Sequence, residues 1–562
     1  MTAPPTGRAA AWGFNGLGEL GDDSTVSSPS PVAVYTRGAL ADKYLTATSS
    51  GYSHSCVVAD GHVYCWGYNG VGELGNNSTA NSTVPVAVDT SGVLNGRTVT
   101  AISAGVGHTC AVADGRVYCW GRNTWGQLGD NSVANSTVPV AVDTSGALQG
   151  KTVTAISAGL GRTCVVADGR AYCWGLNENG ELGNNSTTDS HAPVAVDIAG
   201  VLSGRTVTAI GTGYYHSCAV ADGRAYCWGA NGNGELGNNS TTDSHVPVLV
   251  DISGVLNGKT VTAISAGLQH TVAVADGRAY GWGANYYGLL GNNSIDLTEV
   301  PVAVDTSGVL KGKTVTAISA GFYYHTCAVA DGGAYCWGLN QTGQLGDNST
   351  TDSKVPVGVD TTGTLAGKKI VQVAVGSSFT TALAAAVPQP PTGVKGAPGN
   401  GQVTVSWTTS ADDGGSPIEQ YVATSSPGGL RCTASTTSCT VSGLSNGTAY
   451  RFTVTARNAI GTSSPSGFSP VATPLARAGR VKGLKVTLRM GTAKFGWKKA
   501  ARADSYRLRI SKPGGRMFRP WRITTKRVYT TTVRKGSKYR FQIAAVGPGG
   551  RGPGVTIRFR GK

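Results

Sequence analysis

Ten of the twelve cysteines in this 562-residue chain form five pairs with one spacing, and each pair encloses an Asp-Gly dipeptide. In Cys56-VVADGHVY-Cys65, the Asp-Gly dipeptide favours a two-residue type I′ turn between two strands. Counting outward from this turn places Cys56 opposite Cys65 on a non-hydrogen-bonded rung, where the Cα atoms lie about 4.5 Å apart. Because that separation suits a disulfide bond, we predict hairpin disulfides Cys56–Cys65, Cys110–Cys119, Cys164–Cys173, Cys218–Cys227 and Cys327–Cys336.

Two further copies of this hairpin lack both cysteines, and no copy has only one. Val272 and Gly281 replace the pair in one copy, and Ala11 and Thr381 replace it in another. Loss of both cysteines together is expected if the two form a disulfide bond. Each such bond would contribute about 2–3 kcal/mol to stability. The alternative, reduced cysteines buried as small apolar residues, does not predict paired loss. No Cys-x-x-Cys spacing occurs, so zinc is not expected.

One histidine per repeat stands before the hairpin, and this arrangement raises the question of a metal site. Arg162 and Phe379 interrupt the set, and equivalent positions of a repeat array lie too far apart to converge on one ion. We therefore expect each histidine to bond within its own repeat and predict no metal. The five histidines are His54, His108, His216, His270 and His325.

Residues for catalysis are not recognised in this sequence. It contains no GxSxG, HExxH or phosphate-cradling loop. The repeated acid in GELG (Glu19, Glu73, Glu181, Glu235) becomes Gln127, Leu289 and Gln344 elsewhere, as expected of a structural position. We predict that the protein is not an enzyme and uses no cofactor.

The elements that carry these residues recur with a fixed period. Trp-Gly occurs at Trp12, Trp66, Trp120, Trp174, Trp228, Trp282 and Trp337, with a spacing of 54 and finally 55 residues. Each unit has three clear strands (TAISAG, TCAVA, RVYCW) and a weaker fourth (PVAV). One such unit cannot bury both faces alone, whereas seven arranged radially can. The predicted fold class is all-β: a seven-bladed propeller over residues 1–387, closed by pairing AAAWG with VQVAVGSSFTTALAAAV.

The repeat resembles the regulator of chromosome condensation family of seven-bladed propellers. The resemblance rests on G-x-x-H, the ADGRVYCWG hairpin and WGxNxxGELG, in seven copies over about two thirds of the chain. It implies a binding or regulatory protein, since family members include a nucleotide exchange factor that binds chromatin and secreted bacterial propellers that cover β-lactamases with aromatic loops. The near-identical repeats and cysteine pairs are similar to the secreted bacterial branch.

Two further domains follow a Pro-rich joint. Residues 388–474 resemble a fibronectin type III sandwich, with Trp407 as core tryptophan and Tyr450 as tyrosine corner. Cys432 and Cys439 are predicted to form a sixth disulfide. Residues 475–562 repeat the outline with Trp497 and Tyr539 at a similar separation, which predicts a second, diverged sandwich.

Charge divides the chain unevenly. Residues 475–562 hold 25 lysines and arginines and one acid, a net charge of +24, whereas residues 1–387 carry −9. A small domain with this charge repels itself unless an anion lies near. We expect it to attach to an anionic cell-wall polymer or another polyanion, such as anionic polysaccharide, lipid head groups or nucleic acid. No aromatic residues interleave with the basic ones in the manner typical of nucleic-acid readers.

A partner-binding face is predicted from the differences among the repeats. The xxH turn and the xNxxG loop lie at the same end of an up-and-down sheet, and both vary sharply between copies, while the Asp-Gly end hardly changes. Aromatic and arginine side chains on rigid loops suit recognition of a protein or glycan, although some rings are expected to pack between blades. The candidates are Tyr52, Tyr68, Arg122, Trp125, Arg162, Tyr214, Tyr215, Tyr286, Tyr287, Phe322, Tyr323 and Tyr324, with Phe14 and Phe379 among the further aromatics.

These observations predict a non-catalytic secreted or cell-surface binding protein, expected to be monomeric. The alternatives are an accessory module of extracellular polysaccharide processing and a cytoplasmic exchange-factor-like propeller. No apolar run is long enough to span a membrane. The first residues, MTAPPTGRAAAWGF, contain no signal-peptide segment, so a leader is expected to have been removed or omitted.

Overall fold

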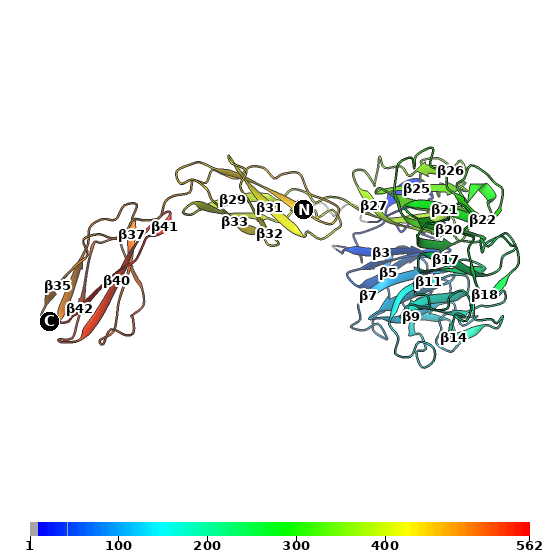
Figure 1. The fold of residues 1–562 in the computed structure, drawn as a ribbon, viewed down its shortest axis with the longest axis horizontal. Coiled ribbons are helices and arrows are strands. Elements are labelled where there is room, and N and C mark those ends of the chain that lie inside the picture. The colour runs from blue at the N-terminus through cyan, green and yellow to red at the C-terminus, as the bar shows by residue number, and fades with distance from the viewer. Residues whose placement is uncertain (1–8, 42) are drawn as a thin grey trace. The chain divides into compact units, whose positions relative to one another are not determined.

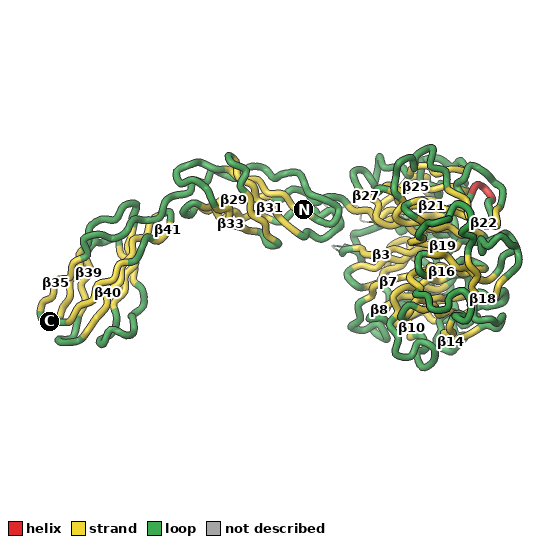
Figure 2. Tube along the Cα trace, viewed as in Figure 1, coloured by secondary structure: helices red, strands yellow, loops and turns green. Residues whose placement is uncertain are grey.

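The computed structural model describes residues 9–41 and 43–562, and nearly all regular elements in them are strands (Figures 1 and 2). One short 3-10 turn, η1 (Tyr286–Gly288), is present. The chain divides into two compact units, with the boundary between Ala386 and Val387. Among the described residues, no helix is long and apolar enough to cross a membrane.

The first unit is a ring of seven four-stranded antiparallel sheets. The first complete blade has the order β3 (Leu45–Ser50), β4 (His54–Ala59), β5 (His62–Gly67) and β6 (Ser82–Ala87). Five more blades repeat this order. Their strands are β7 (Val99–Ala104), β8 (His108–Ala113), β9 (Arg116–Gly121), β10 (Ser136–Ala141), β11 (Val153–Ala158), β12 (Arg162–Ala167), β13 (Arg170–Gly175), β14 (Ser190–Ala195), β15 (Val207–Thr212), β16 (His216–Ala221), β17 (Arg224–Gly229), β18 (Ser244–Leu249), β19 (Val261–Ala266), β20 (His270–Ala275), β21 (Arg278–Gly283), β22 (Thr298–Ala303), β23 (Val315–Ala320), β24 (His325–Ala330), β25 (Gly333–Gly338) and β26 (Ser353–Gly358).

The seventh blade closes the ring with strands from both ends of the unit. Its order is β2 (Ser28–Ala33), β1 (Ala9–Gly13), β28 (Phe379–Ala385) and β27 (Lys369–Val375). Ala11 lies opposite Thr381, as predicted for the closing hairpin. The first strands of successive blades contact one another, and β27 contacts β3, so these strands line the ring's centre. The seven-bladed propeller expected from the repeats is therefore confirmed.

The Asp-Gly hairpins have the predicted register. Asp60 and Gly61 both have positive φ, 49° and 77°, as a type I′ turn requires. Cys56 lies opposite Cys65 with a Cα–Cα distance of 4.1 Å, and the five hairpin disulfides are all formed at 4.0–4.1 Å. Since the bridge joins adjacent strands of one blade, it strengthens that sheet locally.

Each blade's tryptophan is fully buried against the preceding blade. Trp120 packs in a cluster with Cys56 and Cys65, and its indole Nε1 donates to the carbonyl of Glu73 (2.8 Å). Gly75 passes beside the indole, where an added Cβ would lie 2.7 Å from Trp120 Nε1. The Trp-Gly and GELG motifs are thus joined as parts of the same interface between blades.

The second unit contains two β-sandwiches, as expected. In the first, β29 (Thr392–Pro398), β30 (Gln402–Thr408) and β33 (Ser438–Ser442) face β32 (Arg431–Ala434), β31 (Gln420–Ser426) and β34 (Arg451–Arg457) across a core that includes Trp407. Cys432 and Cys439 are bonded, with Cα atoms 6.0 Å apart. The Ser445 N–H donates to Tyr450 Oη (3.0 Å), which forms the tyrosine corner.

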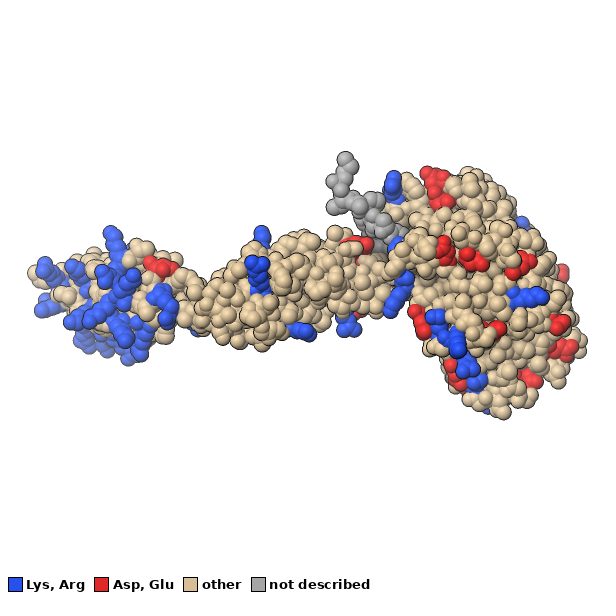
Figure 3. Space-filling view, turned by 90° about the horizontal axis from the view of Figure 1, so that it is seen from above, with Lys and Arg blue, Asp and Glu red and all other residues tan. Residues whose placement is uncertain are grey.

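The second sandwich has the same two features, a core tryptophan and a tyrosine corner. Its sheets are β35 (Lys485–Arg489), β36 (Thr492–Gly496) and β39 (Val528–Thr532) against β38 (Arg522–Thr524), β37 (Ser505–Ile510), β40 (Lys538–Gly547) and β41 (Gly550–Arg551), with β42 (Val555–Arg560) also paired to β40. Trp497 lies in the core, and the Arg534 N–H donates to Tyr539 Oη (2.8 Å). Figure 3 shows lysine and arginine gathered over this domain, whereas acidic residues are scattered over the propeller.

Candidate functional site

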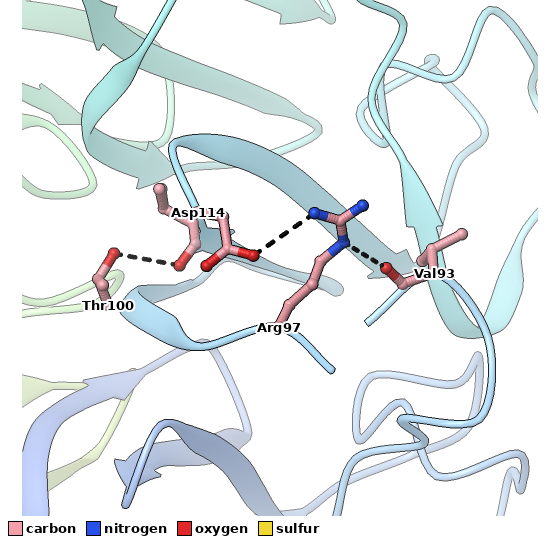
Figure 4. A network of polar contacts seen from close by, with 5 residues as sticks. Val93, Arg97, Thr100 and Asp114 are labelled. Carbon is pink, nitrogen blue, oxygen red and sulfur yellow. Dashed lines mark hydrogen bonds and ion pairs between the residues drawn. The ribbon is translucent and has the colours of Figure 1, made fainter. Parts of the chain in front are cut away.

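The propeller has two unlike ends. Turns between strands one and two and loops between strands three and four emerge at one end, which we call the loop face. The Asp-Gly turns and the connections to the next blade form the other end, the hairpin face. There Arg97 donates to the Val93 carbonyl (2.9 Å) and lies 3.5 Å from the Asp114 carboxylate, so the connection is tied to the turn (Figure 4).

Backbone hydrogen bonds between blades hold the innermost turns of the loop face. The Tyr52 N–H donates to the Gly105 carbonyl (3.1 Å), and the Tyr214 N–H donates to the Gly267 carbonyl (2.9 Å) in the same way. The Val106 and Leu160 N–H groups donate to the next blade likewise, so these four turns present their side chains on a rigid frame.

Four tyrosines from two adjacent blades form a cluster on the loop face, which we call the tyrosine cluster: Tyr286, Tyr287, Tyr323 and Tyr324. Their ring centroids lie 4.5–6.0 Å apart around Tyr324. Tyr286 is 46% exposed and Tyr323 is 37% exposed. Burial and the neighbouring tyrosines raise the pKa of Tyr324. The cluster therefore offers neutral rings and phenol groups to a partner.

A second group gathers around Tyr214. Its ring centroid lies 4.8 Å from that of Tyr215. Burial is the largest of the causes that raise the pKa of Tyr214. Tyr215 and Tyr52 raise this pKa further, and Arg122 lowers it. These residues come from three blades, and the curvature of the ring places them within electrostatic range of Tyr214. Tyr52 is one-third exposed and Arg122 is half-buried.

Two of the three remaining aromatic candidates, Trp125 and Tyr68, pack partly against their surroundings. The Trp125 ring is half-buried against Gly161 of the next blade, where an added Cβ would lie 2.5 Å from Trp125 Cε3. Tyr68 is 36% exposed and folds over Gly70 of its own loop. Both rings are therefore only partly accessible on the loop face.

The histidines lie beneath this face and join neighbouring blades. His108 Nε2 lies 2.9 Å from Thr163 Oγ1, and Thr163 Oγ1 donates to the Gln127 carbonyl (2.9 Å), so the histidine supplies the N–H. The expectation that each histidine bonds its own repeat was wrong, since all five reach the hydroxyl of the next blade. Burial lowers the pKa of His108 to about 3 and that of His54 to about 4, so the rings are neutral.

Comparison with known proteins identifies the propeller. The family model described as RCC1-like domain matches residues 6–382, and that of the fibronectin type III domain matches residues 389–471. The chain belongs to the RCC1-like domain family. Human E3 ubiquitin-protein ligase HERC2 is 32% identical over 69% of this chain, which spans only 8% of HERC2. The ultraviolet-B receptor UVR8 of Arabidopsis thaliana is 30% identical over 62% of this chain and 76% of its own length.

Solved structures show the same fold for this RCC1-like propeller. Yeast RCC1 (Prp20), solved with Kap60 bound, superposes with a TM-score of 0.58 over 68% of this chain and 90% of its own, at 20% identity. Human WBSCR16 gives the same TM-score at 22% identity and covers 99% of its own chain.

Two of the predicted partner-binding residues of the RCC1-like propeller are buried and cannot meet a partner. Phe322 is 7% exposed, and Arg162 is fully buried. The Arg162 guanidinium donates to Ser217 Oγ (3.1 Å) and to the carbonyls of Tyr214 (3.0 Å), Gly213 (3.2 Å) and His216. It occupies the histidine position of its blade, and that position faces the next blade. Phe379, at the same position of the closing blade, is also fully buried.

The GELG acid is structural, as its replacement by leucine indicated. Glu73 Oε2 accepts the Val71 N–H (3.0 Å) and organises its loop. Where Leu289 replaces the acid, the loop instead forms the 3-10 turn, and the Leu289 N–H donates to the Tyr286 carbonyl. This local change places Tyr287 at a φ of 60° within the tyrosine cluster. No group of three or more His, Cys, Asp or Glu that could hold a metal occurs in the described part of the chain.

Sequence reasoning missed an arrangement of arginines and aromatic rings on the basic sandwich, which we call the arginine ladder. Its members are Arg507, Arg509, Phe518, Trp521, Arg540 and Arg551. The guanidinium carbons lie 4.3–5.0 Å from the ring centroids. The alternation in SYRLRI and the nearby Phe518 and Trp521 were the available signal, but interleaving arises only when the strands pair.

Proposed function

We propose that this protein is a non-catalytic, extracellular binding protein. The loop face of its RCC1-like propeller captures a protein partner, and its basic sandwich holds an anionic polymer of the cell envelope. The observation that carries the proposal is the tyrosine cluster: partly exposed rings from adjacent blades lie together at one end of the ring.

Tyrosine suits this role because it supplies a large contact area with few rotatable bonds and a hydrogen-bonding hydroxyl. The inter-blade backbone bonds order four of the innermost turns of the loop face, including those of Tyr52 and Tyr214, before binding, which lowers the entropy cost of association. Yeast RCC1 (Prp20), which has the same propeller fold, has been solved with the protein Kap60 bound.

The location outside the cell is supported by the six disulfides, because bonds of this kind persist in oxidising compartments. Attachment is supported by the charge of residues 475–562, which contain 25 basic residues and a single acidic one. Such a field attracts polyanions over about one Debye length, near 8 Å at physiological salt.

The test replaces Tyr214, Tyr215, Tyr323 and Tyr324 with alanine in the full-length chain. Immobilised wild-type and variant chains are exposed to culture fluid and to envelope extract of the producing organism, and captured proteins are identified by mass spectrometry. A matched control replaces four exposed hairpin-face arginines, Arg116, Arg170, Arg224 and Arg278.

We expect the tyrosine variant to lose the captured partner while the control keeps it, with both melting within a few degrees of wild type. A partner captured equally by the tyrosine variant would show that the loop face is not the site. Tyrosine-dependent binding on a glycan array, without protein capture, would replace the protein partner by a sugar.

A further inference from the structure

The arginine ladder has alternating cationic and aromatic layers. The Arg540 and Arg509 guanidinium carbons lie 4.8 and 4.3 Å from the Phe518 ring centroid. Arg509 also lies 4.3 Å from the Trp521 ring, which Arg507 and Arg551 approach at 4.7 and 5.0 Å. The arginines come from β37, β40 and β41, and the rings come from the segment between β37 and β38. Strand pairing therefore builds the ladder.

These arginines are clustered without acidic neighbours. Asp504 is the only acid in residues 475–562, and the ion pairs found in the described part of the chain between Arg or Lys and Asp lie in the propeller. Polar contacts do hold two of them in place: Arg509 Nε donates to Gln542 Oε1 (2.8 Å) and an Arg540 NH2 group donates to the Arg516 carbonyl (3.0 Å). The arginines of this cluster thus contact aromatic rings through cation–π interactions, instead of the carboxylates that usually neutralise clustered arginines.

Basic residues continue from the ladder along the sheet. Lys538 lies opposite Arg560, and Arg540 lies opposite Arg558, between β40 and β42. Like charges directly opposite one another destabilise a sheet. Arg540 also lines a surface recess with Arg516, Lys538, Arg558 and Arg560. This continuous row of cations destabilises the fold in the absence of an anion. Such a row is expected where the surface binds an anionic ligand.

The geometry favours phosphate as the anionic group. A guanidinium presents its N–H groups in a planar fork that matches two oxygens of a phosphate. When its plane lies near an aromatic ring, its orientation is restricted while the N–H edges remain available to a ligand. Since guanidinium groups already lie over Phe518 and Trp521, a nucleic-acid base would have to displace one of them to stack.

We propose that the arginine ladder binds a linear phosphodiester polymer through its phosphates and without reading bases, as in a polyol-phosphate chain of a cell wall. This inference rests on the proposed attachment function only in that it specifies the site and the chemical group. It is independent of what the loop face binds.

The test measures binding of fluorescently labelled, long-chain inorganic polyphosphate to the full-length chain by anisotropy over a series of salt concentrations. Arg507→Lys and Arg509→Lys are combined in one variant, which keeps the charge but removes two planar forks. A control combines Arg489→Gln, Lys494→Gln and Lys499→Gln, which removes three exposed charges near β35 and β36 in the opposite sheet. Melting curves confirm that each variant is folded.

We expect the double lysine variant to bind polyphosphate about ten-fold more weakly at equal net charge, because bidentate contacts are lost. The control is expected to weaken binding by about three-fold or less, through the general field. Poly(glycerol phosphate) should behave like polyphosphate, and hyaluronate, which carries carboxylates only, should bind more weakly.

The outcomes separate this inference from the attachment function. If the chain binds polyphosphate but the double lysine variant is unaffected, the ladder assignment is wrong and attachment stands. If the wild-type chain binds no polyanion at physiological salt, both fail. Single-stranded DNA binding more than about ten-fold tighter than polyphosphate, at a matched number of phosphates, would overturn the base-free assignment.

Discussion

At the scale of single residues, Arg162 shows how a repeat position controls the role of a side chain. Five other blades have histidine there, and the residue always faces the next blade. Arginine fills the space by donating to Ser217 Oγ and to backbone carbonyls of the neighbouring turn. Burial lowers its pKa to about 10, which Glu181 partly opposes, so it remains charged at neutral pH.

We predict that Arg162→Ala lowers the free energy of unfolding of the propeller by about 3 kcal/mol, because buried acceptors lose their donors. Chemical denaturation followed by tryptophan fluorescence measures the change. Arg162→His, which restores the residue of the other blades, should be milder. Arg170→Ala, on the exposed hairpin face, serves as the control and should be nearly neutral. An Arg162→Ala variant as stable as the control would contradict the assigned role.

At the scale of elements, the hairpin disulfides are additions to a blade that folds without them. The blade containing Val272 and Gly281 has the same register as its bridged neighbours, and its Asp276 turn keeps a positive φ of 47°. The turn chemistry and the buried tryptophan therefore suffice to form the hairpin, and the bridge adds stability.

We predict that Cys110→Val with Cys119→Gly, which copies the unbridged blade, folds and loses about 2–3 kcal/mol. The expected loss is modest because the disulfide closes a short loop and therefore removes little conformational entropy from the unfolded wild-type chain. Denaturation under non-reducing conditions measures the loss, and peptide mass spectrometry of unreduced wild-type protein should show Cys110 linked to Cys119. A variant that fails to fold would mean that the bridge is required for the blade.

At the scale of the whole molecule, the ring is held by a repeated joint rather than by one large core. At the seam, Gln372 of β27 exchanges two hydrogen bonds with the backbone of Thr48 in β3, at 2.9 and 3.1 Å. At five other junctions histidine, threonine and a loop carbonyl join the two blades, and at the sixth Arg162 donates to Ser217 Oγ in place of the histidine. Among the five histidines, the Nδ1 atoms of His108, His216, His270 and His325 are buried without a hydrogen-bond partner.

These joints predict acid sensitivity of the ring. Burial lowers the folded-state pKa of the five histidines from 6.5 to about 3–4, so the unfolded chain binds more protons as the pH falls below 6.5. The contribution of these neutral histidines to the free energy of unfolding is fully present above pH 6.5. It is lost between pH 6.5 and about pH 3–4, by up to about 1.4 kcal/mol per pH unit for each histidine. Burial raises the pKa of Glu19, Glu73 and Glu235, which acts in the opposite direction but on fewer groups.

The measurement is the free energy of unfolding of the propeller between pH 7 and pH 4, which we expect to fall steeply. A His108→Gln variant, which keeps a donor without a titrating ring, should show a smaller slope than wild type. A slope unchanged by this substitution would mean that His108 does not carry the effect.

Much of the architecture follows from local sequence pattern. The fixed spacing of Trp-Gly, the Asp-Gly turns and the split blade predicted seven sheets, the closing pair Ala11–Thr381 and the disulfide partners. The same is true of the tyrosine corners at Tyr450 and Tyr539. The disulfide partners and the tyrosine corners depend on contacts between residues close in sequence, where counting residues is enough to find the neighbour. The closing pair is distant in sequence and follows from aligning the two partial repeats with a complete one.

The contacts between blades and between distant strands were decided only in three dimensions. Whether Arg162 and Phe322 face solvent, and which blade a histidine reaches, depends on how one sheet packs on the next. The arginine ladder likewise needs the pairing of β37 with β40 to bring Arg507 and Arg540 into one row. Residue types and spacing describe what a chain can pair with nearby, whereas burial and long-range contact depend on which surfaces the closed ring and the folded sandwich bring together.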